Sequence, residues 1–386
     1  MQDQSLSLGQ PSPYPSRAAI ELGGALLALA VAGTLARYLI FLLVTGESSP
    51  AAFIEAACAW DCGWYKGIIA DGYGEPGSSV YVNRAFFPLF PALAGGLHQL
   101  TGLSIAASGF AASTVFTLAA ALAARHWFGA NRHAWWLFAF SLFLGPFSVL
   151  LATLYTEALF ILLSILALNA INRQRWLAAG CWVALLSATR VTGVLMGLAI
   201  VAGFVVTHLA AQGNFRTLIP AALRTPRLLL GLLVAPLGLL GYMAFLALDV
   251  GDPLAFLHVQ SSWNRHLQSP LGTLVAAVSR LWTTDLAEFT DVAAHWALLL
   301  GIGLTALLAR RGRIPEAAFC GALILISMIA GSGSMLRFVA GAAPLGMQLC
   351  ELLAGRPGLR FAAYPVIAAL GVLGTMSWFA GSTLLV

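Results

Sequence analysis

Residues 60–91 read WDCGWYKGIIADGYGEPGSSVYVNRAFFPLFP, a polar and turn-rich stretch in a chain that is otherwise almost free of charge. The chain has 386 residues, of which 60% are hydrophobic and only 9% are charged. Soluble globular domains carry about 25% charged residues, so this composition predicts a membrane protein with many spans. The net charge of +5 does not indicate a nucleic-acid partner, because the basic residues are scattered between apolar runs.

Apolar runs follow one another along the chain on both sides of this stretch. Because a span needs about 20 apolar residues, they predict an all-α, single-domain protein over residues 1–386 with about eleven transmembrane helices. The first run continues well past an Ala-Leu-Ala sequence, which favours a retained helix over a signal peptide. Two prolines and a Gly-Gly pair make 86–102 a short interfacial or re-entrant piece. The predicted spans are 18–44, 104–125, 134–152, 155–171, 176–189, 191–210, 228–248, 294–309, 316–332, 337–353 and 361–383.

Basic residues gather in the connections between these runs, where positive charge marks the cytoplasmic side of a membrane protein. With eleven spans, one side of the membrane receives Arg17, Arg125, Arg132, Arg173, Arg175, Arg216, Arg224, Arg227, Arg310, Arg311, Arg313, Arg356 and Arg360. The other basic residues lie on the far side or within a span and need another reason to be there. They are Arg37, Lys66, Arg84, Arg190, Arg265, Arg280 and Arg337.

Most acids and the two longest loops, 45–103 and 249–293, fall on the side away from the cytoplasm. Acids do not set topology, so their clustering indicates that the working surface is on that side. The cytoplasmic connections are short, which fits chemistry outside. The acids concerned are Glu47, Glu55, Asp61, Asp71, Glu75, Glu157, Asp249, Asp252, Asp285, Glu288 and Asp291.

The first loop carries the leading candidate for chemistry, Asp61. An apolar segment with Trp and Tyr that is too charged to span should lie in the membrane interface, which places Asp61 at the depth of lipid headgroups. The alternative is a solvated acid that caps a helix or pairs with Lys66. Cys58 and Cys62 are four apart, a spacing that suits a disulfide poorly and favours packing roles. Pro88 and Pro91 interrupt any regular helix and predict a rigid bend.

Three further charges stand in apolar surroundings. Glu157 begins a span, where it either complements the helix dipole or serves function. Arg190 interrupts the apolar stretch from about 176 to 210 and calls for an anionic partner, either a phosphate or an internal salt bridge such as one to Glu157. Arg337 follows a Gly-Ser turn at a helix start, where phosphate also binds well. The two arginines fit one negatively charged lipid headgroup.

Polar and aromatic side chains of both loops suit a polyhydroxylated ligand through hydrogen bonds and ring stacking. The candidates for binding an acceptor or a sugar are Tyr65, Trp64, Gln260, Trp263 and His258. Interfacial anchoring is the alternative role for Trp263. No cluster has zinc-site spacing, and neither a G-x-S-x-G nor a Walker-type loop is present.

The segment WDCGWYKGIIADGY followed by FFPLFP resembles the PIG-V-like mannosyltransferases, which belong to the GT-C superfamily of membrane glycosyltransferases. Further similar segments follow in the same order, so the resemblance covers roughly residues 20 to 345. The first segment is quite specific, whereas the others are short. They are YTEALF, ATRVTG, GDPLAF with the later Gln260 and Trp263, and SMLRF.

The resemblance implies a GT-C fold and inverting transfer of a sugar, with mannose as the expected one, from a polyprenyl-phosphate donor to a lipid, glycan or protein acceptor. It implies Asp61 as the catalytic base in the first outer loop, with Glu157, Asp71 or Glu55 as candidates for a second acid. Arg190 and Arg337 would bind the donor phosphate. No cofactor is required, although Mg²⁺ or Mn²⁺ bridging acids and phosphate stays open. The Ala-, Gly- and Leu-rich composition favours a bacterial inner membrane, with the site facing the periplasm or exterior.

Two other classes compete with this prediction. A secondary transporter or lipid flippase should carry charges at the bilayer midplane and an internal repeat, and no repeat is visible. A GT-C transferase that uses a different lipid-linked sugar is the nearer alternative.

Overall fold

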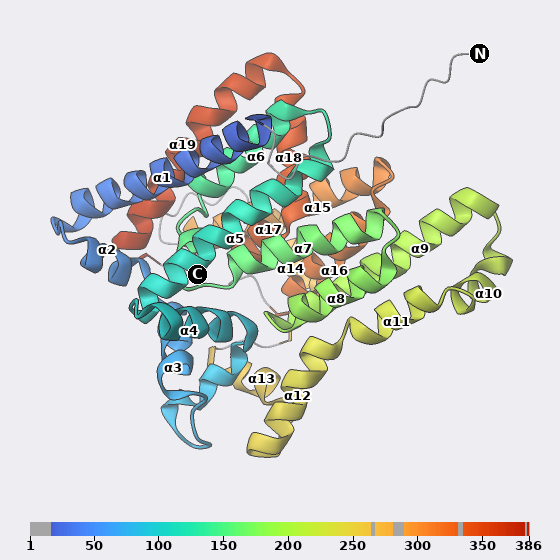
Figure 1. The fold of residues 1–386 in the computed structure, drawn as a ribbon, viewed down its shortest axis with the longest axis horizontal. Coiled ribbons are helices and arrows are strands. Elements are labelled where there is room, and N and C mark those ends of the chain that lie inside the picture. Colours follow the sequence, from blue (N-terminus) through green and yellow to red (C-terminus); the bar gives the residue numbers. More distant parts are fainter. Residues whose placement is uncertain (1–16, 264–266, 281–288, 331–334, 383, 386) are drawn as a thin grey trace, which may run out of the picture.

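The computed structural model describes residues 17–263, 267–280, 289–330, 335–382 and 384–385, and within them the chain is helical with no strand (Figure 1). The α-helices are α1 (Arg17–Thr45), α2 (Pro50–Ala57), α3 (Cys62–Asp71), α4 (Leu89–Thr101), α5 (Ile105–Phe128), α6 (Arg132–Leu144), α7 (Glu157–Asn172), α8 (Trp176–Ser187), α9 (Met196–Gln212), α10 (Leu218–Leu223), α11 (Pro226–Val234), α12 (Leu237–Val250), α13 (Ala255–His258), α14 (Pro270–Ser279), α15 (Phe289–Arg310), α16 (Ile314–Ala330), α17 (Met335–Gly341), α18 (Ala343–Ala354) and α19 (Pro357–Phe379). Short 3₁₀ helices are η1 (Ser79–Ala85), η2 (Leu150–Ala152), η3 (Val191–Leu195), η4 (Phe215–Thr217) and η5 (Val259–Trp263).

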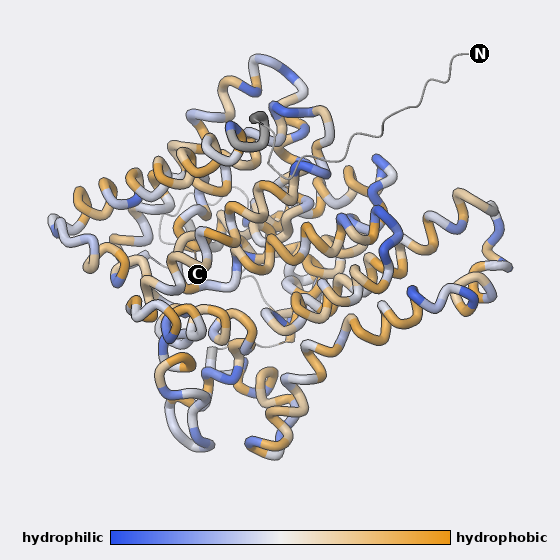
Figure 2. The backbone as a smooth tube through the Cα atoms, in the orientation of Figure 1, coloured by the Kyte–Doolittle hydropathy of each residue, from blue (hydrophilic) through white to orange (hydrophobic). Residues whose placement is uncertain are grey.

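Six helical segments of the described chain are long and apolar enough to cross a membrane, and the pair α17–α18, bent by 71°, would make a seventh. Apolar colour covers most of the tube in Figure 2. The chain is therefore a membrane protein of all-α class. The remaining apolar helices are shorter than a span, among them α7, α8, α14 and α16. The count of eleven spans stays a prediction, because several runs are divided by breaks such as Gly145-Pro146 between α6 and η2.

Helix α7 lies at the centre of the bundle and packs against α5, α8 and α9. Its sequence, EALFILLSILALNAIN, is apolar on all sides, which is the pattern of a helix with neighbours all round. Most of its side chains are buried, including the Glu157 side chain at its first residue. The central position of α7 therefore carries an acid into the protein interior.

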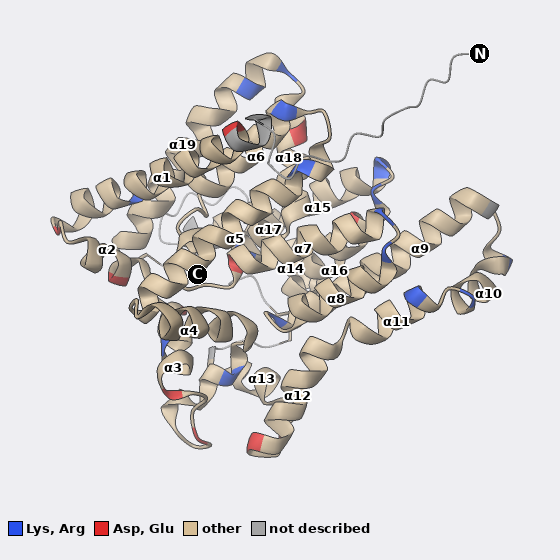
Figure 3. Cartoon of the chain, viewed as in Figure 1, with Lys and Arg blue, Asp and Glu red and all other residues tan. Residues whose placement is uncertain are grey.

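Charges separate toward two ends of the bundle, as Figure 3 shows. Lys and Arg lie mainly at the connections α5–α6, α7–α8, α15–α16 and α18–α19, whereas acids lie mainly around α2, α3 and the end of α12. This separation agrees with the pattern expected from the sequence.

The segment with two prolines differs from the expectation that 86–102 contains no regular helix at Pro88 and Pro91. Helix α4 starts at Leu89 and continues through Pro91. A proline in the first turn loses no intrahelical hydrogen bond, because the first amides of a helix have no partner within it. Pro88 precedes the helix as its N-cap, and the Leu89 amide donates to the Ala188 carbonyl at 3.1 Å. The prolines therefore start a helix against the end of α8.

Close backbone contact through glycines holds α8 against α11 and α12. A methyl group added at Gly180 would overlap the carbonyl oxygen of Gly231, and one at Gly238 would overlap that of Ala184. Small residues allow helices to approach this closely in membranes. Gly241, one turn further along α12, has open space beside it.

We expect Gly238→Ala to lower the stability of the protein by about 1–3 kcal/mol, because the added methyl must push two backbones apart. Gly241→Ala is the matched control on the same helix and should be neutral or stabilising by up to about 1 kcal/mol, since alanine is the better helix former. Thermal unfolding in detergent measures both. Equal shifts for the two variants would contradict the close packing of α8 and α12.

Candidate functional site

Four charged side chains from distant parts of the chain meet in one cluster. Arg337 of α17 donates from Nη1 to Asp61 Oδ2 at 2.6 Å, and from Nε and Nη2 to Glu157 Oε1 at 2.9 and 2.7 Å. Arg190, between α8 and η3, pairs through Nη2 with the same Glu157 oxygen at 3.2 Å. The structure thus brings together the four charges that the sequence placed in apolar surroundings or in the first loop. We call these residues the four-charge cluster.

Glu157 is the hub of the cluster. Its side chain is only 4% exposed, and its Oε1 atom receives both arginines. A buried carboxylate needs such partners, because an unpaired charge in the interior costs several kcal/mol. Its Oε2 atom is buried and has no hydrogen-bond partner among the described residues. The salt bridge between Arg190 and Glu157, one of the two alternatives for Arg190, is therefore present.

The outer members of the cluster are Asp61 and Arg190, each with a side chain 20% exposed, whereas Arg337 is 6% exposed. The Arg190 guanidinium lies 5.9 Å from the ring centres of both Phe160 and Phe338. A ligand can therefore reach a carboxylate and a guanidinium that lie on either side of a buried ion pair. The binding of donor phosphate by Arg337 stays a prediction, and in this structure that guanidinium is occupied by carboxylates.

The turn that carries Asp61 is fixed by hydrogen bonds to its carbonyl groups. The Ala57 carbonyl accepts from the Thr153 hydroxyl at 2.9 Å and from Trp378 Nε1 at 3.2 Å. The Ala59 carbonyl accepts from the Tyr155 hydroxyl at 3.0 Å. These donors come from the segment just before α7 and from α19, so the position of Asp61 depends on the same core that holds Glu157.

A disulfide between Cys58 and Cys62 closes this turn, which corrects the expectation of two packing cysteines. The expectation assumed one continuous helix, but α2 ends at Ala57 and α3 begins at Cys62. Trp60 between them adopts φ +55°, an uncommon backbone conformation for a large side chain, and the two Cα atoms lie 5.2 Å apart. Disulfides persist in oxidising compartments, which fits a loop on the non-cytoplasmic side.

The other candidates for a second acid lie outside the cluster. Glu55 pairs with Lys66 at 2.7 Å in an exposed ion pair, and Asp71 is exposed at the end of α3. Only Glu157 of the three proposed second acids reaches Arg337 and Arg190 among the described contacts.

The aromatic candidates of the first loop pack against the rings of neighbouring phenylalanines. Tyr65 is buried, and its ring packs edge-on against Phe86 and Phe90 at 5.1 and 6.0 Å. Trp64 is half-buried and stacks on Phe86 at 6.2 Å. The Tyr65 ring is therefore packed among other aromatic rings, and the binding of a sugar by Tyr65 and Trp64 stays a prediction.

The loop that follows α12 packs against the loop that follows α1 through α13, η5 and η1. His258 bonds through Nδ1 to Asp252 Oδ2 at 2.7 Å on the surface, and this hydrogen bond lowers the pKa of Asp252. Gln260 donates to the Phe256 carbonyl at 3.3 Å. Trp263 ends η5, and its side chain, like residues 264–266, lies outside the described part of the chain. No described contact joins these candidates to the four-charge cluster, so their roles stay predictions.

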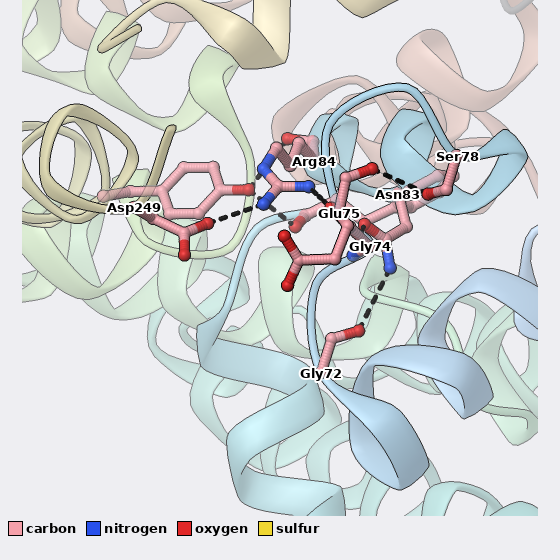
Figure 4. Close-up of polar contacts among 9 residues, drawn as sticks. Gly72, Gly74, Glu75, Ser78, Asn83, Arg84 and Asp249 are labelled. Atoms are coloured by element: carbon pink, nitrogen blue, oxygen red, sulfur yellow. Dashed lines mark hydrogen bonds and ion pairs between the residues drawn. The ribbon is translucent and has the colours of Figure 1, made fainter. Parts of the chain in front are cut away.

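Another buried arginine, Arg84, ties the loop that follows α3 to the end of α12 (Figure 4). Its Nη2 atom lies 2.6 Å from Asp249 Oδ2 at the end of α12, and Nη1 donates to the Gly74 carbonyl. Asn83 donates to the Gly72 carbonyl at 3.2 Å and accepts from the Gly74 amide at 3.2 Å. This ion pair was not predicted from the sequence, because its two members lie 165 residues apart.

Comparisons with known proteins gave no match, since no family model fits the chain and no curated protein is significantly similar to it. In the described part of the chain, no group of three or more His, Cys, Asp or Glu could hold a metal ion. The geometry of the four-charge cluster is therefore the basis on which we infer a function.

We expect Glu157→Gln to lower the free energy of unfolding by about 3 kcal/mol, because it leaves two guanidinium groups short of one negative charge in the interior. Glu55→Gln removes a carboxylate from an exposed pair and should cost less than about 1 kcal/mol. Titration with SDS in mixed micelles measures both. Similar losses for the two variants would show that Glu157 is no hub.

Proposed function

We propose that this protein is a glycosyltransferase of the GT-C type that transfers a sugar, with mannose as the proposed sugar, from a polyprenyl-phosphate donor to an acceptor hydroxyl. The observation that carries the proposal is that two partly exposed groups, the Asp61 carboxylate and the Arg190 guanidinium, are linked through one buried ion pair. Asp61 pairs with Arg337, Arg190 pairs with Glu157, and Arg337 and Glu157 pair with each other. A base and a phosphate-binding cation are the two groups that such a transfer needs.

Arg190 is the residue that we assign to the donor phosphate. A guanidinium binds phosphate oxygens bidentately, and the Phe160 and Phe338 rings beside it suit the lipid end of a polyprenyl donor. Among the described residues, the carboxylate partner of Arg190 is one Glu157 oxygen at 3.2 Å, and a guanidinium has five N–H donors, so we propose that its other N–H groups bind the phosphate.

Asp61 is the proposed general base. Arg337 holds its Oδ2 atom, which leaves Oδ1 to receive the proton of the acceptor hydroxyl. The acceptor oxygen forms a bond to the anomeric carbon as the bond from that carbon to the phosphate oxygen breaks, with inversion. The negative charge that develops on the departing polyprenyl phosphate falls beside Arg190. Arg337 and Glu157 then act by orienting the two groups, and we propose no cofactor for the step.

The depth of the cluster favours a membrane-embedded donor. Helix α7 has 16 residues and is therefore about 24 Å long, whereas the hydrocarbon core of a bilayer is about 30 Å thick. If the C-terminal end of α7, beside the arginine-rich α7–α8 connection, lies at one membrane surface, then Glu157 at the N-terminal end lies just inside the opposite leaflet. A lipid-linked phosphate reaches this depth without leaving the membrane.

A transporter or flippase is the second candidate class. Such proteins place binding charges near the bilayer midplane. The four-charge cluster instead lies at helix ends on the acid-rich side of the bundle, before α3, at the start of α7 and after α8. This position favours an enzyme.

We expect Asp61→Asn to fold normally and to lower sugar transfer by at least about 100-fold, because the amide cannot accept the acceptor proton. Asp71→Asn is the matched control, with the same change at the other end of α3, and should keep near-wild-type activity. The assay incubates purified protein and acceptor membranes with radiolabelled polyprenyl-phosphate-mannose and follows label into product. Full activity of Asp61→Asn would remove the base assignment, and absence of transfer by the wild type would remove the proposed donor.

A further inference from the structure

A cavity of about 370 Å³ opens between α1, α6 and α19, three helices that run side by side in Figure 1. None of its lining residues belongs to the four-charge cluster. We call it the α1–α6–α19 groove. It is lined by Ala25, Ala28, Leu29 and Ala32 of α1, Trp136 and Phe140 of α6, and Tyr364 of α19.

The three helices approach one another most closely through glycines at the end of the groove away from the start of α1. A methyl added at Gly33 would overlap the Phe143 carbonyl oxygen, and one at Gly371 would overlap that of Leu144. At the same end, Arg37 donates to the Phe143 carbonyl at 2.9 Å. Nearer the start of α1, alanines face the aromatic side chains and leave space unfilled.

The floor of the groove is aromatic. The Phe140 and Tyr364 rings meet edge-to-face at 5.0 Å and join α6 to α19. Trp136 lies one turn closer to the start of α6. Trp and Tyr are the side chains found at the boundary between lipid headgroups and acyl chains. The groove therefore changes from apolar to interfacial character toward the start of α6 and α19.

Basic residues lie at the end of the groove near the starts of α6 and α19, which we call its mouth. Arg132 lies one turn before Trp136 on α6, and Arg360 lies one turn before Tyr364 on α19, so each arginine shares a helix face with a lining aromatic. Neither arginine has a carboxylate within 4.0 Å among the described side chains, because the nearby acid Glu351 pairs with Arg311 and Arg313 instead. Figure 3 shows basic residues at the starts of both helices.

Glu21 is the acid on the third side of the mouth, one turn before Ala25 on α1. Against two arginines it leaves a net positive charge, which is complementary to an anionic headgroup. An arginine near an anionic membrane surface contributes about 1 kcal/mol of attraction, equivalent to about fivefold in affinity.

We infer that the α1–α6–α19 groove binds an anionic phospholipid of the leaflet at the basic end of the bundle. One acyl chain lies along the alanines of α1, and the phosphate lies between Arg132 and Arg360. This site is independent of the proposed sugar transfer, because it uses none of its residues and lies at the other end of the molecule.

The test compares lipid retention by native mass spectrometry after exchange into micelles that contain equal amounts of palmitoyl-oleoyl phosphatidylglycerol and phosphatidylcholine. The wild type should prefer the anionic lipid, and the double variant Arg132→Gln/Arg360→Gln should lower that preference by about 30-fold relative to the wild type, as the loss of two arginines predicts. Arg224→Gln is the control, since Arg224 is an exposed arginine at the end of α10, remote from the groove, and should keep the preference.

Filling the groove tests the acyl-chain half of the site. Ala28→Leu should lower retention of both lipids while leaving the arginines in place. Equal retention of the two lipids by the wild type, or an equal loss of preference in Arg224→Gln, would overturn the proposal. Efficient cross-linking of Ala28→Cys between two copies in native membranes would also overturn it, because a second helix would then occupy the groove. If Ala28→Leu fails to fold, the double arginine variant still decides the question.

Discussion

The Oε1 atom of Glu157 is the point on which the centre of the molecule depends. It receives two guanidinium groups from segments that follow it by 33 and 180 residues, and one of these groups also holds Asp61 from the first loop. Charges of this kind are expensive inside a membrane protein unless they pair. Pairing therefore requires the α2–α3 turn, the start of α7, the end of α8 and α17 to converge, and this convergence builds the candidate site.

The sequence predicted the class of the fold and most of the cluster. Composition alone indicated a helical membrane protein, and Arg190 and Arg337 were visible because arginines in apolar surroundings need an anionic partner. The pairing could not be predicted, because nothing local specifies that Arg337 bridges Asp61 and Glu157 across 276 and 180 residues. For the same reason the Arg84–Asp249 pair was missed. The disulfide was missed because the turn that closes it contains Trp60 with a positive φ. The start of α4 was missed because a proline in the first turn is compatible with a helix.

The two ends of the bundle have different chemistry. At the acid-rich end, the hydrogen-bonded turn with its disulfide presents Asp61 to the four-charge cluster. At the basic end, Arg132 and Arg360 lie one helical turn before aromatic residues that line an apolar groove. Helices such as α7 are shorter than a membrane span. Charges at their ends can therefore lie below the membrane surface, while longer neighbouring helices cross the whole bilayer. Lipid would then meet the protein in two roles, as a reactant at one end and as a bound component at the other.

A cryo-electron microscopy map of the protein bound to polyprenyl phosphate would show whether Arg190 binds the donor phosphate. We expect phosphate density at about 3 Å from the Arg190 guanidinium, with Glu157 and Arg337 still paired behind it and Asp61 facing the phosphate. A phosphate bound elsewhere, with the ion pair between Arg190 and Glu157 unchanged, would rule out this role of Arg190.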